Sequence, residues 1–221
     1  MSLDHLRDWI GRSETHADVA TAAPLAGLAA TLDHDTPPWL DGEVRRSTID
    51  DVAAKDGRSG RMVFVKVRHE IATAAGPALT EIHDIVYREA AGAGDASPAG
   101  EPPPAPAVWE RRILPDPVLL LRFSALTFNG HRIHYDRDYC RDAEGYPGLV
   151  FHGPLSATLL VDLFLRHHPG ARVTAFSFRA KRPLFDIHPL SVCGCPTAQG
   201  ARLWVADHQG FVAMSAELEA Q

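Results

Sequence analysis

Residues 128–136, with the sequence FNGHRIHYD, place two histidines, an asparagine and an arginine within nine positions. His134 is the first candidate for chemistry, because a histidine side chain has an ordinary pKa of about 6.5 and can accept a proton near neutral pH. Asn129, five positions earlier, has an amide that can hold a water or a carbonyl group without competing for that proton. An isolated histidine on an ordered segment is more often structural than catalytic, and it is the grouping of polar side chains that favours a proton-transfer site here.

A second candidate is the dipeptide His152-Gly153, which precedes Pro154 in the stretch YPGLVFHGPLSATLLVDLF. Proline is favoured in the first turn of a helix, so we predict that a helix begins at Pro154. A glycine just before a helix lets a ligand approach the backbone N–H groups, where the helix dipole adds partial positive charge. The pattern therefore indicates an oxyanion-binding site at Gly153. The alternative interpretations are a glycine that only permits a tight turn into the helix and a structural His152.

The elements that must position these residues follow from the periodicity of the C-terminal half. Apolar residues at helical spacing predict one helix after Pro154, and they are Leu155, Leu159, Leu160, Leu163 and Phe164. Four runs with strand-like composition follow it, separated by proline or glycine turns, and they cover residues 172–184, 190–198, 201–210 and 211–220. This order predicts an α+β fold in which an antiparallel sheet wraps around a central helix.

The N-terminal half has a different pattern. Residues 43–89 alternate apolar and polar positions, with turn signals at Asp56-Gly57 and Gly76-Pro77, which predicts an antiparallel meander of strands. Residues 90–108 are nearly all Ala, Gly and Pro and predict a linker whose proline-rich part is extended. We therefore expect an N-terminal repeat over residues 1–89, this linker, and a catalytic domain over residues 109–221.

Composition excludes several classes of protein. The chain has 221 residues, of which 45% are hydrophobic and 23% charged, values typical of a globular protein that buries a core. Its net charge of −6 gives no general attraction to nucleic acids or anionic membranes. No apolar run approaches the roughly 20 residues of a membrane-spanning helix, and the N-terminal residues are too charged for a signal peptide, so we expect a cytoplasmic protein. Its three cysteines lack the pattern of a zinc site and are expected to be small buried thiols.

The stretch SALTFNGHRIHYDRDYCRDAEGYPGLVFHGPLSATLL resembles the hydratase motif of MaoC-like hot-dog proteins. The resemblance is closest to the branch that contains the hydroxyacyl-thioester dehydratases type 2 and the mesaconyl-C4-CoA hydratases. It implies that His134 is the general base, that Asn129 takes the place of the motif's aspartate, and that the backbone N–H of Gly153 binds the oxyanion. The change from aspartate to Asn129 departs from the wider superfamily and bears on any mechanism that needs two ionisable groups.

The resemblance also covers the N-terminal half of the chain and implies a double hot-dog fold. In this fold the first repeat is shortened between the segments LAATLD and EVRRSTI. The implied activity is the addition or removal of water across the double bond of an enoyl-CoA thioester, in fatty acid metabolism or with a mesaconyl or itaconyl group. His131, Arg132, His152 and Pro154 are the candidate substrate-binding residues. The forked donors of Arg132 could pair with a coenzyme A phosphate or a substrate carboxylate, and the alternative is an exposed arginine that is only solvated. No metal, nicotinamide or flavin is implied, no nucleic acid or membrane partner is expected, and residual exposed surface of the first repeat could drive homodimerisation.

Two other classes of protein stay open at this point. A hot-dog thioesterase would use a carboxylate to activate water against the carbonyl carbon, and the position of that carboxylate holds Asn129. A non-catalytic acyl-CoA-binding subunit is the other alternative, and the shortened first repeat favours it.

Overall fold

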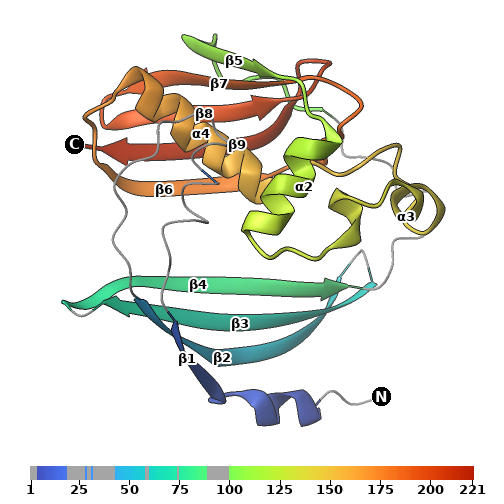
Figure 1. Ribbon diagram of the computed structural model, residues 1–221, viewed down its shortest axis with the longest axis vertical. Coiled ribbons are helices and arrows are strands. Elements are labelled where there is room, and N and C mark those ends of the chain that lie inside the picture. Colours follow the sequence, from blue (N-terminus) through green and yellow to red (C-terminus); the bar gives the residue numbers. More distant parts are fainter. Residues whose placement is uncertain are drawn as a thin grey trace. The chain divides into compact units, whose positions relative to one another are not determined.

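The computed structural model (Figure 1) describes residues 4–18, 28, 31, 43–57, 60–73, 75–88 and 100–221. The chain divides into two compact units. One unit comprises residues 1–25 and 37–96, and the other comprises residues 26–36 and 97–221. Each unit contains its own antiparallel sheet.

The N-terminal unit is a four-stranded sheet preceded by a short 3-10 helix. The elements are η1 (Asp4–Trp9), β1 (Ser13–Asp18), β2 (Glu43–Gly57), β3 (Gly60–Thr73) and β4 (Gly76–Arg88), and the strands pair in the order β1-β2-β3-β4. Val65 of β3 lies opposite Val52 on one side and Ile85 on the other, so the β-branched residues meet across the strands. The predicted meander is confirmed. Strand β1 was not predicted, because its sequence SETHAD has no apolar alternation.

The C-terminal unit contains a five-stranded antiparallel sheet. Its strands are β5 (Trp109–Ile113), β6 (Val173–Ala180), β7 (Leu190–Thr197), β8 (Gly200–Ala206) and β9 (Val212–Ala220), in the order β5-β7-β8-β9-β6. The four predicted runs form β6 to β9, so this prediction is confirmed. The edge strand β5 was not predicted, because two arginines interrupt its short sequence WERRI and a proline-rich stretch precedes it.

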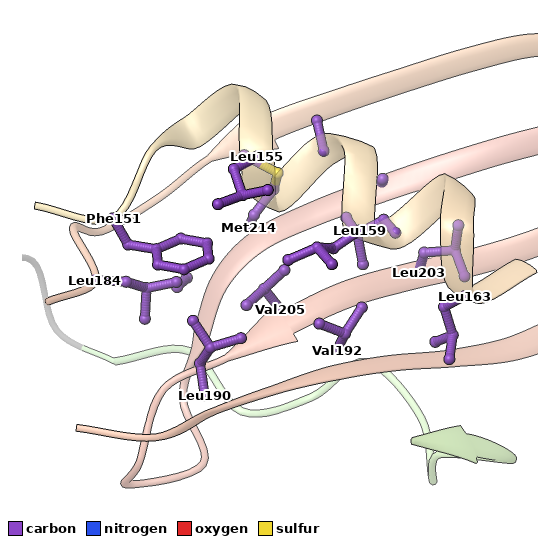
Figure 2. Close-up of a cluster of buried hydrophobic side chains, with 14 of the residues drawn as sticks. Phe151, Leu155, Leu159, Leu163, Leu184, Leu190, Val192, Leu203, Val205 and Met214 are labelled. Carbon is purple, nitrogen blue, oxygen red and sulfur yellow. The ribbon is translucent and has the colours of Figure 1, made fainter. Parts of the chain in front are cut away.

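One helix, α4 (Gly153–His167), lies across this sheet (Figure 1) and contacts β5, β7, β8 and β9. It begins one residue earlier than predicted, at Gly153, with Pro154 in its first turn. Figure 2 shows the leucines of α4 directed at apolar side chains of the strands. Leu155, Leu159 and Leu163 of the helix belong to the same buried cluster as the strand residues Val192, Leu203, Val205 and Met214. Full burial of each such side chain contributes about 1.5–3 kcal/mol, so the sheet holds the helix and its N-terminus in a fixed place.

Three shorter helices lie between β5 and α4. They are α2 (Pro117–Leu126), η2 (Arg132–His134) and α3 (Arg137–Asp142). The Asp116 carboxylate caps α2 by accepting the N–H groups of Val118 and Leu119 at 2.7 and 2.9 Å, and Asp136 caps α3 in the same way. Neither helix was predicted, although an aspartate followed by proline is a helix-start signal. Among the described residues, no helix is long and apolar enough to cross a membrane.

The proline-rich half of the predicted linker packs on the C-terminal sheet. The N–H of Val108 donates to the Gly194 carbonyl, and the N–H of Val212 donates to the Glu101 carbonyl, both at 2.8 Å. A Cβ at Gly100 would lie 2.3 Å from the Phe211 ring, so only glycine fits there. Residues 100–108 are therefore part of the C-terminal unit, whereas residues 90–99 lie outside the described residues. The boundaries at 89 and 109 stay a prediction.

Candidate active site

His134 lies in η2 and is almost fully buried, with 7% of its surface exposed. Its Nδ1 lies 2.7 Å from the Val150 carbonyl oxygen. A carbonyl oxygen only accepts hydrogen bonds, so Nδ1 carries the hydrogen and Nε2 keeps its lone pair. Burial lowers the pKa of His134 below its ordinary value, the nearby His131 lowers it further, and the bond to Val150 opposes them. His134 is therefore a neutral imidazole with a basic Nε2 at neutral pH.

The His152 ring packs against the face of the His134 ring. The two rings are stacked, with centroids 3.7 Å apart and planes 15° from parallel. His152 is fully buried, its Nε2 lies 2.9 Å from the Ser124 hydroxyl, and Phe123 meets its ring edge-on. Burial, and then the neighbouring His134, lower the pKa of His152 to about 3. Because the His152 ring is neutral and fully buried, a role in positioning the His134 ring fits it better than direct contact with the substrate, the role expected from the sequence.

The pH dependence of activity should reflect the buried environment of His134. A general base must be unprotonated, so if His134 has that role we expect activity above its pKa and a loss of activity as the pH falls through it. Because burial lowers that pKa, we expect the acidic limb of a plot of kcat/KM against pH to be centred below the ordinary value of 6.5. Steady-state rates measured across the acidic and neutral range check this. A limb centred above 6.5 would show that His134 is not the titrating base.

The N-terminus of α4 offers free backbone donors beside this pair of rings. The first N–H groups of a helix have no partner within it, and the His152 side chain, which stands at the capping position, makes no capping bond in the described part of the chain. Gly153 has no positive φ, and apart from its chain neighbours and its own helix an added Cβ would meet no atom of the described residues within 4 Å. Neither backbone strain nor crowding by other described residues therefore explains this glycine.

The loop before η2 places Asn129 next to His131. The Asn129 side-chain oxygen accepts the backbone N–H of His131 at 3.1 Å, and the Asn129 N–H donates to the Ser124 carbonyl at 2.9 Å. Phe128 has a φ of 51°, a left-handed conformation that is rare for a bulky residue and that is found most often near functional sites. The amide nitrogen of Asn129 is the part of its side chain that could orient a water.

His131 and Arg132 differ in whether their side chains lie beside His134. The His131 ring meets the His134 ring edge-on, with centroids 5.7 Å apart. Arg132 donates through Nε and Nη2 to the Asp136 carboxylate at 3.0 and 2.7 Å, and its guanidinium lies 4.2 Å from the centre of the Tyr139 ring. The structure therefore brings His131, His134 and His152 together, whereas Arg132 is held against α3.

The segment that carries the Val150 carbonyl is fixed from both sides. The N–H of Val150 donates to the Ile133 carbonyl at 2.9 Å, and the N–H of Phe151 donates to the Leu184 carbonyl at 2.8 Å. The buried Asp186 carboxylate accepts the Leu149 N–H at 2.9 Å and also binds Arg137. These bonds hold the acceptor that sets the tautomer of His134.

Replacing Asp186 with alanine is expected to lower the free energy of unfolding by about 1–3 kcal/mol, because it leaves the buried Leu149 N–H without an acceptor. Arg137 is half exposed and can be hydrated, so its loss of a partner adds little. Asp186→Asn keeps an acceptor oxygen and should cost less. Urea unfolding of the three proteins measures the difference, and equal stability of the alanine and asparagine variants would contradict the assignment of this bond.

Sequence reasoning did not find Ser124, Val150 or Asp186. Ser124 opens the motif quoted above, but a serine without an adjacent base carries no catalytic signal. Val150 acts through its backbone carbonyl, which leaves no mark in the sequence. Asp186 could have been suspected only as a carboxylate in an apolar stretch.

The antiparallel sheet packed on one central helix defines a hot-dog fold. The chain is similar in structure to a MaoC-like dehydratase from Phytophthora capsici, with a TM-score of 0.73 and 11% identity, over 100% of this chain and 98% of the other. At this identity the likeness concerns the fold. The prediction of an α+β, double hot-dog fold is confirmed.

The family follows from sequence similarity. Residues 29–186 match the family hydroxyacyl-thioester dehydratase type 2, and the chain belongs to this family. It is 45% identical over 175 residues to mesaconyl-C(4)-CoA hydratase from Chloroflexus aurantiacus. The aligned residues cover 79% of this chain and 62% of that protein. It is 36% identical over 93 residues to the mitochondrial hydroxyacyl-thioester dehydratase type 2 of Schizosaccharomyces pombe. The aligned residues cover 41% of this chain and 30% of that protein. The chain thus spans less than two thirds of the length of these relatives.

Proposed function

We propose that the chain is an acyl-CoA hydratase or dehydratase, a hydro-lyase that adds water to, or removes it from, an enoyl thioester. The observation that carries the proposal is the state of His134, a buried neutral imidazole whose Nδ1 is bound to the Val150 carbonyl, leaving Nε2 as a base. Membership of the dehydratase family supports it. The names of the two relatives support a thioester substrate.

The chemistry needs one base and one oxyanion donor. In hydration, Nε2 of His134 takes a proton from a water as the water oxygen attacks the β-carbon. The electron pair of the double bond moves toward the thioester, and the developing enolate oxygen accepts the N–H of Gly153 at the positive end of α4. The α-carbon then takes the proton from His134, which returns to its neutral form. Dehydration runs through the same steps in reverse.

Asn129 orients the water in this proposal. Its side-chain oxygen is already bound to the His131 N–H, so the amide nitrogen is the group that can donate to the water oxygen. A carboxamide does not compete for the proton, and His134 is therefore the single base. This arrangement differs from an aspartate and histidine pair, in which two groups ionise.

A panel of thioesters tests the proposal. Crotonyl-CoA and mesaconyl-CoA are incubated with the protein while the ultraviolet absorbance of the conjugated enoyl thioester and the release of free thiol are followed together. A hydratase lowers the absorbance without releasing thiol. Release of thiol would instead indicate a thioesterase, and binding of the thioester without either change would indicate a non-catalytic acyl-CoA-binding subunit.

Other parts of our interpretation stay predictions. Large apolar side chains on β4 are exposed, Leu79, Ile82, Val86 and Tyr87 among them, and this supports homodimerisation. A cytoplasmic location is expected from the composition of the chain. The absence of a resident cofactor and a role in fatty acid metabolism are expected from its resemblance to the hot-dog hydratases.

A further inference from the structure

A pocket of about 300 Å³ lies beside the first turns of α2 and α4 and the end of β5. Its apolar wall is formed by Ile113, Leu114, Val118, Leu119, Leu155 and Leu159. Three arginines line the same pocket, namely Arg111, Arg112 and Arg122. An apolar wall combined with guanidinium groups suits a ligand that has an anionic group beside a short apolar part.

The charges of this pocket are only partly balanced. Arg111 donates to the buried Asp162 carboxylate at 2.9 Å. Asp116 is the single acidic residue among the described lining residues, and its Oδ1 accepts the two backbone N–H groups that cap α2. Within the described part of the chain, no carboxylate forms an ion pair with Arg112 or Arg122. The two guanidinium groups are therefore available to an anion.

The pocket lies close to the proposed oxyanion donor. A helix rises 1.5 Å per residue, so Leu155 and Leu159 stand roughly 3 and 9 Å along α4 from Gly153. Arg122 directly precedes Phe123 and Ser124, which both contact the His152 ring. The lining residues of the pocket thus lie in the same helical turns as Gly153 and next to the residues that contact His152.

We infer that Arg122, with Arg112, binds an anionic group of the thioester substrate in this pocket. The inference rests on the proposed function and adds a specificity-determining residue to it. A carboxylate and a phosphate are both bound by the forked donors of an arginine. The anion can therefore be a second carboxylate on the acyl group or a phosphate of the coenzyme A carrier.

The test compares Arg122→Met with the wild-type protein on three substrates. Mesaconyl-CoA has the acyl carboxylate and the phosphates, crotonyl-CoA has the phosphates alone, and crotonyl-N-acetylcysteamine has neither. Loss of charge-assisted hydrogen bonds should lower kcat/KM by about 10- to 100-fold for each substrate that uses the pocket. Arg122→Lys should recover part of the loss. Arg141→Met is the matched control, because Arg141 is exposed and lies in α3, outside the pocket, and it should leave all three rates unchanged.

The outcomes separate the two sources of the anion. A loss confined to mesaconyl-CoA supports the inference and assigns the acyl carboxylate, whereas an equal loss with both coenzyme A esters and none with the truncated thioester supports it and assigns a phosphate. No change with any substrate, or the same loss with all three, overturns it. Failure of the wild-type protein to hydrate any of the three would reject the proposed function itself.

Discussion

Replacing His134 with alanine is expected to lower kcat by about 10²–10⁴-fold, the range usual for the loss of a general base. The structure leaves Nε2 of His134 free to take a proton because Nδ1 is bound to the Val150 carbonyl, and His152 cannot substitute because burial lowers its pKa to about 3. Turnover of an enoyl-CoA substrate by the purified variant measures the loss.

The matched variants separate catalysis from folding. Alanine at position 134 removes a ring from the stack with His152 and so leaves a cavity. His134→Gln fills more of that space but provides no base, and it should be as inactive as the alanine variant. His188→Ala, at an exposed histidine that stacks on His208, should keep full activity. If either variant at position 134 folds with a normal melting temperature and retains near-normal turnover, His134 is not the base.

The framework of the C-terminal unit could be predicted because its periodicity is local. The leucines at 155, 159 and 163 recur at helical spacing, and they face the sheet in the structure. The four strands after the helix are bounded by proline or glycine, so their existence and order follow from the sequence. Strand β5 and helix α2 were not predicted, the first because charged residues break its short pattern and the second because its dense apolar run PVLLLRFSAL lacks the polar face of an amphipathic helix.

The chemical state of the candidate site could not be predicted, because contacts between distant residues set it. The sequence indicates that His134 could be a base, but its tautomer depends on the Val150 carbonyl, 16 positions away. The orientation of its ring depends on His152, whose own partner is Ser124, 28 positions earlier. Only the folded chain brings these groups together, and backbone carbonyls leave no signal in the residue types.

Replacing Gly153 with proline is expected to lower kcat by about 10²–10³-fold, the loss observed when an oxyanion donor is removed. Proline has no N–H, and it is well tolerated in the first turn of a helix. His152 has an extended backbone, with φ of −63° and ψ of 129°, which is the conformation that a residue before proline prefers. Position 153 itself precedes Pro154, and the residue before a proline is disfavoured in the helical conformation. Circular dichroism therefore first establishes that the helix persists, and turnover of an enoyl thioester then measures the loss of the donor.

Gly153→Ala is the variant that isolates the role of the N–H. An alanine keeps the donor, and apart from its chain neighbours and its own helix its Cβ would meet no atom of the described residues within 4 Å. Because the residue before a proline is disfavoured in the helical conformation, the melting temperature of this variant is measured together with its activity. We expect the alanine variant to raise KM with a smaller fall in kcat, and the proline variant to lose kcat as the enolate loses its hydrogen bond. Equal kcat values for the alanine and proline variants would mean that the Gly153 N–H does not stabilise the transition state, and the donor would then have to be sought at another backbone position, with the Leu155 N–H of the same helical turn as the next to test.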